Sequence, residues 1–420
     1  MAAAASVTRV MRRVARVTTT NANYHFVITK PGSYYLSANL SVTKPNGIRV
    51  ATTDVTLDLN GFAIQRASSV GPGTAVEIDL SAWLCTVKNG SIGGLVASGA
   101  PTTSFQHGVH ALSDGDYAFA PFSGSFVDLT VGQCTGTAIA AGIGSRIERC
   151  SISDSGTGIT AGPAAVIIQA TVVRSQSNGI VAAAGALVSN CTIAGSAPSK
   201  GIQVGTGSMI SKCTVRDTAS QHAIHAGAGS TVAGCTVSTN FPGAATSAYG
   251  IFAPDGAVTI TRCSVSDVGP AQASDTSGVG ISAGSTSTVS RCTVNNNKSH
   301  GIVIGSDSVV LDCTTARNGT ALRSGAGIRA TGGRNRIKGN TAVGNPRGIA
   351  VALTGNLIED NHVRNNTGAG IEVPTTNGKN IVVRNSAGGN GTNYAIAAGN
   401  SDAPVATPTS ATNPFTNIQN

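Results

Sequence analysis

The feature that most constrains this chain is a short strand motif, Gly-Ile-x-Val, that recurs fifteen times along its 420 residues. Its first apolar position is held in turn by Ile48, Val76, Val109, Ile139, Ile159, Ile180, Ile202, Ile224, Ile251, Ile281, Ile302, Ile328, Ile349, Ile371 and Ile396. Many of the steps are 20 to 22 residues, with additions but no deletions. A fixed minimum spacing is typical of a solenoid whose coil has a constant circumference.

A second motif, Cys-Thr-Val, precedes most copies of the first. In the stretch 289–294, alternation predicts that Val289, Cys292 and Val294 point inward. Strands this short cannot pair within their own coil, so they pair with the coils above and below, about 4.8 Å away, in parallel sheets. The sequence therefore predicts an all-β fold, a parallel β-helix solenoid of about fifteen coils.

Composition agrees with one long folded core. Only 11% of the residues are charged, whereas 40% are hydrophobic and recur with a period. A solenoid overrides the usual expectation of two or three domains, because each repeat contacts only its neighbours. We expect the β-helix over residues 24–400, an N-terminal tail or capping helix over 1–23 and an irregular C-terminal cover over 401–420.

The first 20 residues contain Arg9, Arg12, Arg13 and Arg16, and no acidic residue precedes Asp54. The valines of this segment recur three or four apart, which predicts an amphipathic helix. Such a helix would cover the open first coil, and an arginine-rich targeting segment is the alternative. The segment lacks the apolar core of a secretory signal, and no stretch is long and apolar enough to span a bilayer.

Nine cysteines forbid complete disulfide pairing. Seven share one repeat position, which stacks on itself from coil to coil, so we expect an internal column of buried thiols. These seven are Cys150, Cys191, Cys213, Cys235, Cys263, Cys292 and Cys313. No CxxC pair appears, so the sequence predicts no metal site.

The net charge of +9 is compatible with several partners. Nucleic acid is disfavoured, because the Lys and Arg residues are scattered singly and aromatic residues are few. An acidic polysaccharide suits a long, mildly basic surface, and simple solubility explains the charge equally well. The oligomeric state is left open by the sequence.

Additions to the minimal coil fall mostly at one corner, between a Cys-Thr-Val strand and the next Gly-Ile strand. They occupy 65–73, 93–106, 239–249, 266–278 and 317–325, and a separate insertion at 113–125 lies elsewhere. Long loops of repeat proteins usually carry their binding function. We therefore expect a binding wall along this corner.

Aromatic residues, acids and histidines gather in the first quarter of the chain. Alternation places Glu77 and Asp79 outward on either side of Ile78, with His110 outward one coil later, about 5 Å further along the axis. Carboxylates and imidazole beside aromatic rings suit a sugar site. The predicted catalytic residues are Glu77, Asp79, His110 and Asp116, and the predicted substrate-binding residues are Trp83, His107, Asp114 and Tyr117. The alternative is an N-terminal cap with solvated loop acids.

The opening segment carries a family resemblance. Residues 28–36 (Ile-Thr-Lys-Pro-Gly-Ser-Tyr-Tyr-Leu), 47–50 (Gly-Ile-Arg-Val) and 55–61 (Val-Thr-Leu-Asp-Leu-Asn-Gly) resemble the start of bacterial right-handed parallel β-helix repeat proteins of the pectate-lyase-like superfamily. The resemblance covers roughly residues 24–400. It implies a right-handed coil with three sheets, polysaccharide as partner and a secreted or cell-surface location, and it allows Ca²⁺ as a cofactor.

Fold alone does not define the reaction, and two classes of function stay open. One is an enzyme, a polysaccharide lyase or glycoside hydrolase, acting on an extracellular and uronate-rich polymer. The other is a non-catalytic surface or adhesion module, or a structural solenoid. Arg336-Ile337-Lys338 matches one polygalacturonase-like element, but no paired aspartates accompany it. The absence of the family's catalytic motifs favours a non-catalytic binding module, whereas the family resemblance leaves an enzyme as an open alternative.

Overall fold

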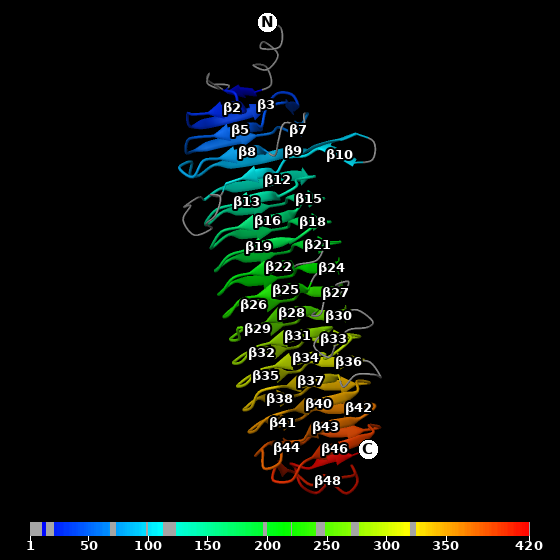
Figure 1. Cartoon of the computed structure of the whole chain (residues 1–420). Coiled ribbons are helices and arrows are strands. Elements are labelled where there is room, and N and C mark those ends of the chain that lie inside the picture. The colour runs from blue at the N-terminus through cyan, green and yellow to red at the C-terminus, as the bar shows by residue number, and fades with distance from the viewer. Residues whose placement is uncertain are drawn as a thin grey trace. The chain divides into compact units, whose positions relative to one another are not determined.

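The protein's structure, a computed structural model, describes residues 11–13, 21–67, 73–97, 100–111, 123–195, 200–219, 221–240, 248–269, 277–319 and 325–419. All of the helices and strands assigned in these residues are β-strands (Figure 1). In the described residues, therefore, no helix has the length and hydropathy needed to cross a bilayer. The chain divides into two compact units, and each is built from coils of short parallel strands.

The first unit comprises Met1–Ala197 and Ile202–Gly205. Its strands form three columns in which each strand pairs in parallel with the equivalent strand of the next coil. The first column holds β2 (Tyr24–Ile28), β5 (Asn46–Val50), β8 (Thr74–Ile78), β11 (His107–His110), β13 (Thr137–Ala141), β16 (Thr157–Ala161) and β19 (Ile180–Ala182). The second holds β3 (Gly32–Leu36), β6 (Val55–Asp58), β14 (Arg146–Glu148), β17 (Val166–Ile168) and β20 (Leu187–Ser189). The third holds β4 (Leu40–Val42), β7 (Ala63–Arg66), β15 (Ser151–Ser153), β18 (Thr171–Val173) and β21 (Thr192–Ala194), and the long strands β9 (Thr86–Ala97) and β12 (Ser125–Gly132) belong to both the second and the third.

The second unit comprises Pro198–Gly201 and Thr206–Asn420, so the division falls within β22 (Lys200–Val204). Its first column holds β25 (His222–Ala226), β28 (Tyr249–Ala253), β31 (Val279–Ala283), β34 (Ile302–Ile304), β37 (Ala326–Ala330), β40 (Arg347–Val351), β43 (Ala369–Val373) and β46 (Thr392–Ile396). The second holds β23 (Met209–Ser211), β26 (Thr231–Ala233), β29 (Thr259–Thr261), β32 (Thr288–Ser290), β35 (Val309–Leu311), β38 (Arg336–Lys338), β41 (Leu357–Glu359), β44 (Ile381–Val383) and β47 (Ser401–Asp402). The third holds β24 (Thr214–Thr218), β27 (Thr236–Asn240), β30 (Ser264–Val268), β33 (Thr293–Asn295), β36 (Thr314–Ala316), β39 (Thr341–Val343), β42 (His362–Arg364), β45 (Ser386–Gly388) and β49 (Asn417–Gln419).

The interior of the coils confirms the predicted column of cysteines. All nine thiols are reduced, and none is more than 2% exposed. In the second unit Cys292 and Cys313 stack directly, and the backbone N–H of Cys292 donates to Sγ of Cys313 at 3.4 Å. Cysteine therefore serves here as a small apolar residue whose weak S–H donor reaches a nearby carbonyl.

Asparagine takes over this position late in the second unit. Asn340, Asn361 and Asn385 are buried, and each amide donates along the stack to the next. The left-handed corner residue is instead the one before, as at Asp360 with φ 57° and Arg384 with φ 56°. The hydrogen bonds between asparagine side chains thus stabilise the stack. The residue before each asparagine, and not the asparagine itself, adopts the unfavourable left-handed conformation.

The prediction of an N-terminal helix is wrong at Met11–Arg13. These residues form strand β1, which pairs antiparallel with β3 through Met11–Leu36, Arg12–Tyr35 and Arg13–Tyr34. The segment is rich in Val and Thr, which favour strands, and an open sheet edge offers unpaired backbone groups. A paired strand therefore covers this edge of β3 where we expected a helix.

Two further expected segments contain regular structure. In the insertion at 93–106, β9 continues to Ala97 and pairs antiparallel with β10 (Ala100–Thr103). The C-terminal cover holds β47, β48 (Val405–Ala406) and β49, joined by turns, and β49 pairs with both β45 and β48. Most of the other insertions lie outside the described residues.

Candidate functional site

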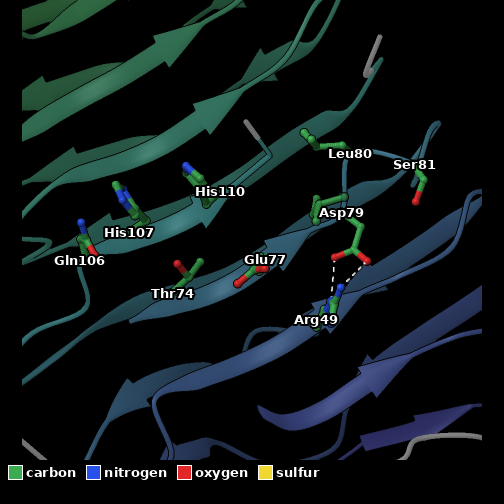
Figure 2. Close-up of a pocket in the computed structure, with 10 residues that line it drawn as sticks. Arg49, Thr74, Glu77, Asp79, Leu80, Ser81, Gln106, His107 and His110 are labelled. Atoms are coloured by element: carbon green, nitrogen blue, oxygen red, sulfur yellow. Dashed lines mark hydrogen bonds and ion pairs between the residues drawn. The ribbon is translucent and has the colours of Figure 1, made fainter. Parts of the chain in front are cut away.

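A polar pocket of about 530 Å³ lies on the outer face of β5, β8 and β11 in the first unit (Figure 2). It is lined by Arg49, Thr74, Glu77, Ile78, Asp79, Leu80, Ser81, Gln106, His107 and His110. Four of the eight predicted site residues, Glu77, Asp79, His107 and His110, are brought together in it. Their chemical roles stay a prediction.

Strand register explains how these side chains meet. Glu77 pairs with Arg49 on one side and with His110 on the other, so the three residues form one outward column. Each occupies the x position of the Gly-Ile-x-Val motif, whose flanking residues point into the coil and are buried. The spacing of the motif had predicted that His110 lies one coil from Glu77.

Asp79 is held by an arginine. Arg49 donates to both carboxylate oxygens, from Nε to Oδ1 at 2.7 Å and from Nη2 to Oδ2 at 2.9 Å (Figure 2). This bidentate bond raises the pKa of Arg49 above its usual value. Asp79 therefore orients the Arg49 guanidinium, because a bidentate pair fixes the geometry of both groups.

Glu77 is engaged by a tyrosine two coils away. The Tyr24 hydroxyl donates to Oε2 of Glu77 at 2.7 Å, and the guanidinium of Arg49 lies 5.7 Å from the centre of the Tyr24 ring. Burial and the bond to Glu77 both raise the pKa of Tyr24. Tyr24 therefore stays protonated at neutral pH and fixes one Glu77 oxygen, while the Glu77 side chain remains only partly buried.

The two histidines form a stacked pair at the other end of the pocket. The rings of His107 and His110 lie 4.5 Å apart, centre to centre, with an interplanar angle of 24°. The backbone N–H of Thr137 donates to Nδ1 of His107 at 3.2 Å. In the neutral ring the proton therefore sits on Nε2, because a neutral imidazole has one donor and one acceptor nitrogen.

Trp83 lies on the loop that follows the pocket wall. Its indole Nε1–H donates to the carbonyl of Leu80 at 3.2 Å, and Leu80 itself lines the pocket. Trp83 is 49% exposed, and Leu80 and Leu84 are also exposed. Trp83 is not among the lining residues, and its role in binding a sugar stays a prediction. The predicted residues Asp114, Asp116 and Tyr117 lie outside the described residues.

The sequence did not single out Tyr24, Arg49, Thr74 or Gln106. Arg49 carried a usable signal, because it occupies the same motif position as Glu77 and His110. Tyr24 carried none, since its partner Glu77 lies 53 residues further along the chain.

The pocket does not suit the Ca²⁺ that the family resemblance allowed. Ca²⁺ binds six to eight oxygen ligands, whereas both Asp79 oxygens are bound by Arg49 and one Glu77 oxygen by Tyr24. Throughout the described part of the chain, no group of three His, Cys, Asp or Glu side chains converges as metal ligands.

Comparison with known proteins gives one family match. A family model described as a right handed beta helix region matches residues 133–269 and 200–357, which together span more than half of the chain. A search of curated proteins finds no match.

Several solved structures are similar at low identity. The periplasmic alginate epimerase AlgG is 12% identical, with a TM-score of 0.37, over 93% of this chain and 77% of that chain. The A-module of the Azotobacter vinelandii mannuronan C-5 epimerase AlgE6 is 13% identical, with a TM-score of 0.28, over 89% of each chain. The catalytic domain of a GH87 alpha-1,3-glucanase in complex with tetrasaccharides is 10% identical, with a TM-score of 0.34, over 97% of this chain and 70% of that chain. Likenesses at this level assign neither substrate nor reaction.

Proposed function

The chain belongs to the family of right-handed β-helix proteins, and on that premise we propose that it binds a polysaccharide, with one sugar residue seated in the pocket of the first unit. The observation that carries the proposal is the convergence of Glu77, Asp79, His107 and His110 in one pocket. A pocket with convergent polar groups is the usual place for a ligand.

The chemistry of the lining suits a sugar. Carboxylate oxygens accept hydrogen bonds from hydroxyl groups, and Thr74, Ser81 and Gln106 add neutral donors and acceptors around them. A hydrogen bond to a charged group contributes about 1.5–3 kcal/mol. Outside the lining, the exposed ring of Trp83 offers an apolar surface to the C–H face of a neighbouring sugar.

The arrangement fits a binding module better than a glycoside hydrolase. Hydrolysis by two carboxyl groups requires one of them to act as a proton donor. Asp79 is unsuited to that task because both of its carboxylate oxygens already accept hydrogen bonds from Arg49. Glu77 therefore has no second free carboxyl group among the pocket residues, and we propose binding as the primary role.

A second candidate function rests on the histidines and Tyr24. Removal of a proton beside the carboxylate of a uronate needs a base and a proton donor, which is the chemistry of a polysaccharide lyase. His107 and His110 lie in the same pocket as Glu77, and the protonated Tyr24 hydroxyl lies 2.7 Å from Glu77. In this candidate the imidazole accepts the proton from C5, the C4–C5 double bond forms as the C4–O bond breaks, and the Tyr24 hydroxyl gives its proton to the leaving oxygen. Either role places the chain at the cell surface or in the secreted fraction, where such polymers occur.

A panel of polysaccharides separates these possibilities. The full chain is passed over immobilised polygalacturonate, alginate and a neutral glucan, and the eluate is scored for retention, unsaturated product and new reducing ends. Retention without product supports the binding module, and unsaturated product supports the lyase. Glu77→Gln should weaken retention, whereas Asp154→Asn, which alters an exposed carboxylate paired with Arg174, should not. Absence of both retention and product on every polymer would overturn both candidates.

A further inference from the structure

A second group of charged side chains lies in the second unit, on the outer face of its first strand column. His300 lies just before β34, Arg329 is on β37, Arg347 is on β40 and Glu372 is on β43. His300 is only 4% exposed, while Arg329 is partly exposed. A buried imidazole beside a partly exposed guanidinium is an unusual pair for an outer strand face, because burying the polar ring nitrogens is costly.

Both ring nitrogens of His300 face groups that can only donate. The backbone N–H of Ala326 donates to Nδ1 at 2.9 Å. Nη1 of Arg329 lies 2.9 Å from Nε2. A guanidinium has no acceptor atom, and a neutral imidazole has only one acceptor nitrogen. Because Nδ1 is already accepting, Nε2 carries the proton and faces another donor.

The His300 imidazole does not gain a second proton at neutral pH. Burial, together with the positive charges of Arg329 and Arg347, lowers the pKa of His300 to about 3. At neutral pH the ring is therefore neutral. Two N–H groups, one from His300 and one from Arg329, lie next to each other, and no acceptor is recorded between them among the described residues. An anion satisfies such an arrangement.

Among the described residues, no carboxylate is paired with Arg329. Its neighbours in the outward column are Val303 on one side and Ala350 on the other. The nearby acid, Glu372, is paired with Arg347, whose Nη1 lies 2.8 Å from its Oε2. Within the described part of the second unit, no ion pair involves Arg329, so the group carries one uncompensated positive charge.

We propose that Arg329 and His300 form a seat for a single carboxylate, whose oxygens accept from the Arg329 guanidinium and from Nε2–H of His300. One uncompensated charge matches a carboxylate rather than a doubly charged phosphate. The seat itself is independent of the pocket in the first unit. Its assignment to the carboxylate of an acidic sugar rests on the proposed function, and it makes a uronate-containing polymer the substrate class.

Imidazole nitrogen NMR of the full chain tests the seat directly. Galacturonic acid is titrated into the protein, with galactose as the neutral control and inorganic phosphate as the alternative anion. Galacturonic acid should perturb the His300 nitrogens, and galactose should not. Arg329→Gln should weaken that response at least about 10-fold, because a charged hydrogen bond is lost. Arg291→Gln, at an exposed arginine of the same unit, should leave it within about twofold.

Each further outcome decides the proposal. Arg329→Lys keeps the charge but loses the planar fork, so it should bind with intermediate affinity, and a melting curve of each variant confirms folding. Glu77→Gln should leave the His300 response unchanged, which separates this seat from the first pocket. No perturbation of His300 by galacturonic acid would overturn the seat, and tighter binding of phosphate would overturn the assignment to a sugar acid.

Discussion

The strands that carry the pocket and the strands that follow them in the same column differ on one face only. We call β5, β8 and β11 the pocket strands and β13, β16 and β19 the plain strands. The inward residues match, since Ile48, Val76 and Val109 of the pocket strands are buried like Ile139, Ile159 and Ile180 of the plain strands. The outward residues between them are Arg49, Glu77 and His110 in the pocket strands and Ala140, Thr160 and Val181 in the plain strands.

The difference shows which residues the coil requires. The plain strands form the same parallel pairs with small or uncharged outward side chains. Charged groups at these positions are therefore not needed for the fold, and partly burying them costs free energy. Residues that the fold does not require, gathered in one pocket, are better explained by a ligand than by stability.

Among substitutions on the pocket strands, we expect Glu77→Gln to have the largest effect, and we expect that effect on polysaccharide binding. Glu77→Gln keeps the shape of the side chain but removes the charge that accepts from sugar hydroxyls. We expect the affinity for the retained polysaccharide to fall roughly 10- to 100-fold, because such a bond contributes about 1.5–3 kcal/mol. Isothermal titration measures this fall, with Asp154→Asn as the matched control. Equal losses in both variants would show that the charge acts at long range and not in the pocket.

Asp79→Asn should have a smaller effect, because Asp79 acts by orienting Arg49. Loss of the bidentate bond frees the Arg49 side chain and should weaken binding about 10-fold. A double-mutant cycle with Arg49→Gln separates orientation from direct contact. If the two substitutions add without coupling, Arg49 does not act through Asp79 and the geometric account of this pair is wrong.

His110→Ala gives a pocket strand the residue that a plain strand carries at Ala140. Its effect on folding should be small, with the free energy of unfolding changed by less than about 1 kcal/mol, because His110 is partly exposed and stacks on the ring of His107 at the surface. Denaturant unfolding measures this change, and binding is measured on the same sample. A loss of several kcal/mol would mean that the pocket strands need their polar face to fold.

We expect the smallest difference between the two regions in the reactivity of the buried cysteines inside the coils, where both sets of strands are alike. Burial raises the pKa of Cys85, and it raises that of Cys134 to about 12 and that of Cys150 to about 11. Thiolate, the reactive form, is therefore scarce at pH 8. Native protein should label slowly with a thiol reagent at all three positions, and unfolded protein should label quickly. Rapid native labelling at Cys85 alone would show that the pocket strands are loosely closed.

The contrast between inward and outward residues also explains which features of the structure could be predicted from the sequence. Repeat spacing predicted the coil and the inward cysteines, because a coil of fixed circumference imposes both. Alternation also predicted the register of Glu77 with His110. It could not predict that Tyr24 reaches Glu77 or that Arg49 neutralises Asp79, since these contacts depend on side-chain conformations between coils. The helical spacing at the N-terminus was misleading at Met11–Arg13, because the edge of β3 favours a paired strand.

Titration of tryptophan fluorescence tests the central claim most directly, because Trp83 is the only tryptophan in the chain and its indole bonds to the pocket residue Leu80. Oligosaccharides from the retained polymer are added to the native protein and to Glu77→Gln. We expect a saturable change in Trp83 emission that needs at least about 10-fold more sugar in the variant. A polymer that is retained without any change in Trp83 emission, or with the same change in both proteins, would contradict a sugar site in this pocket.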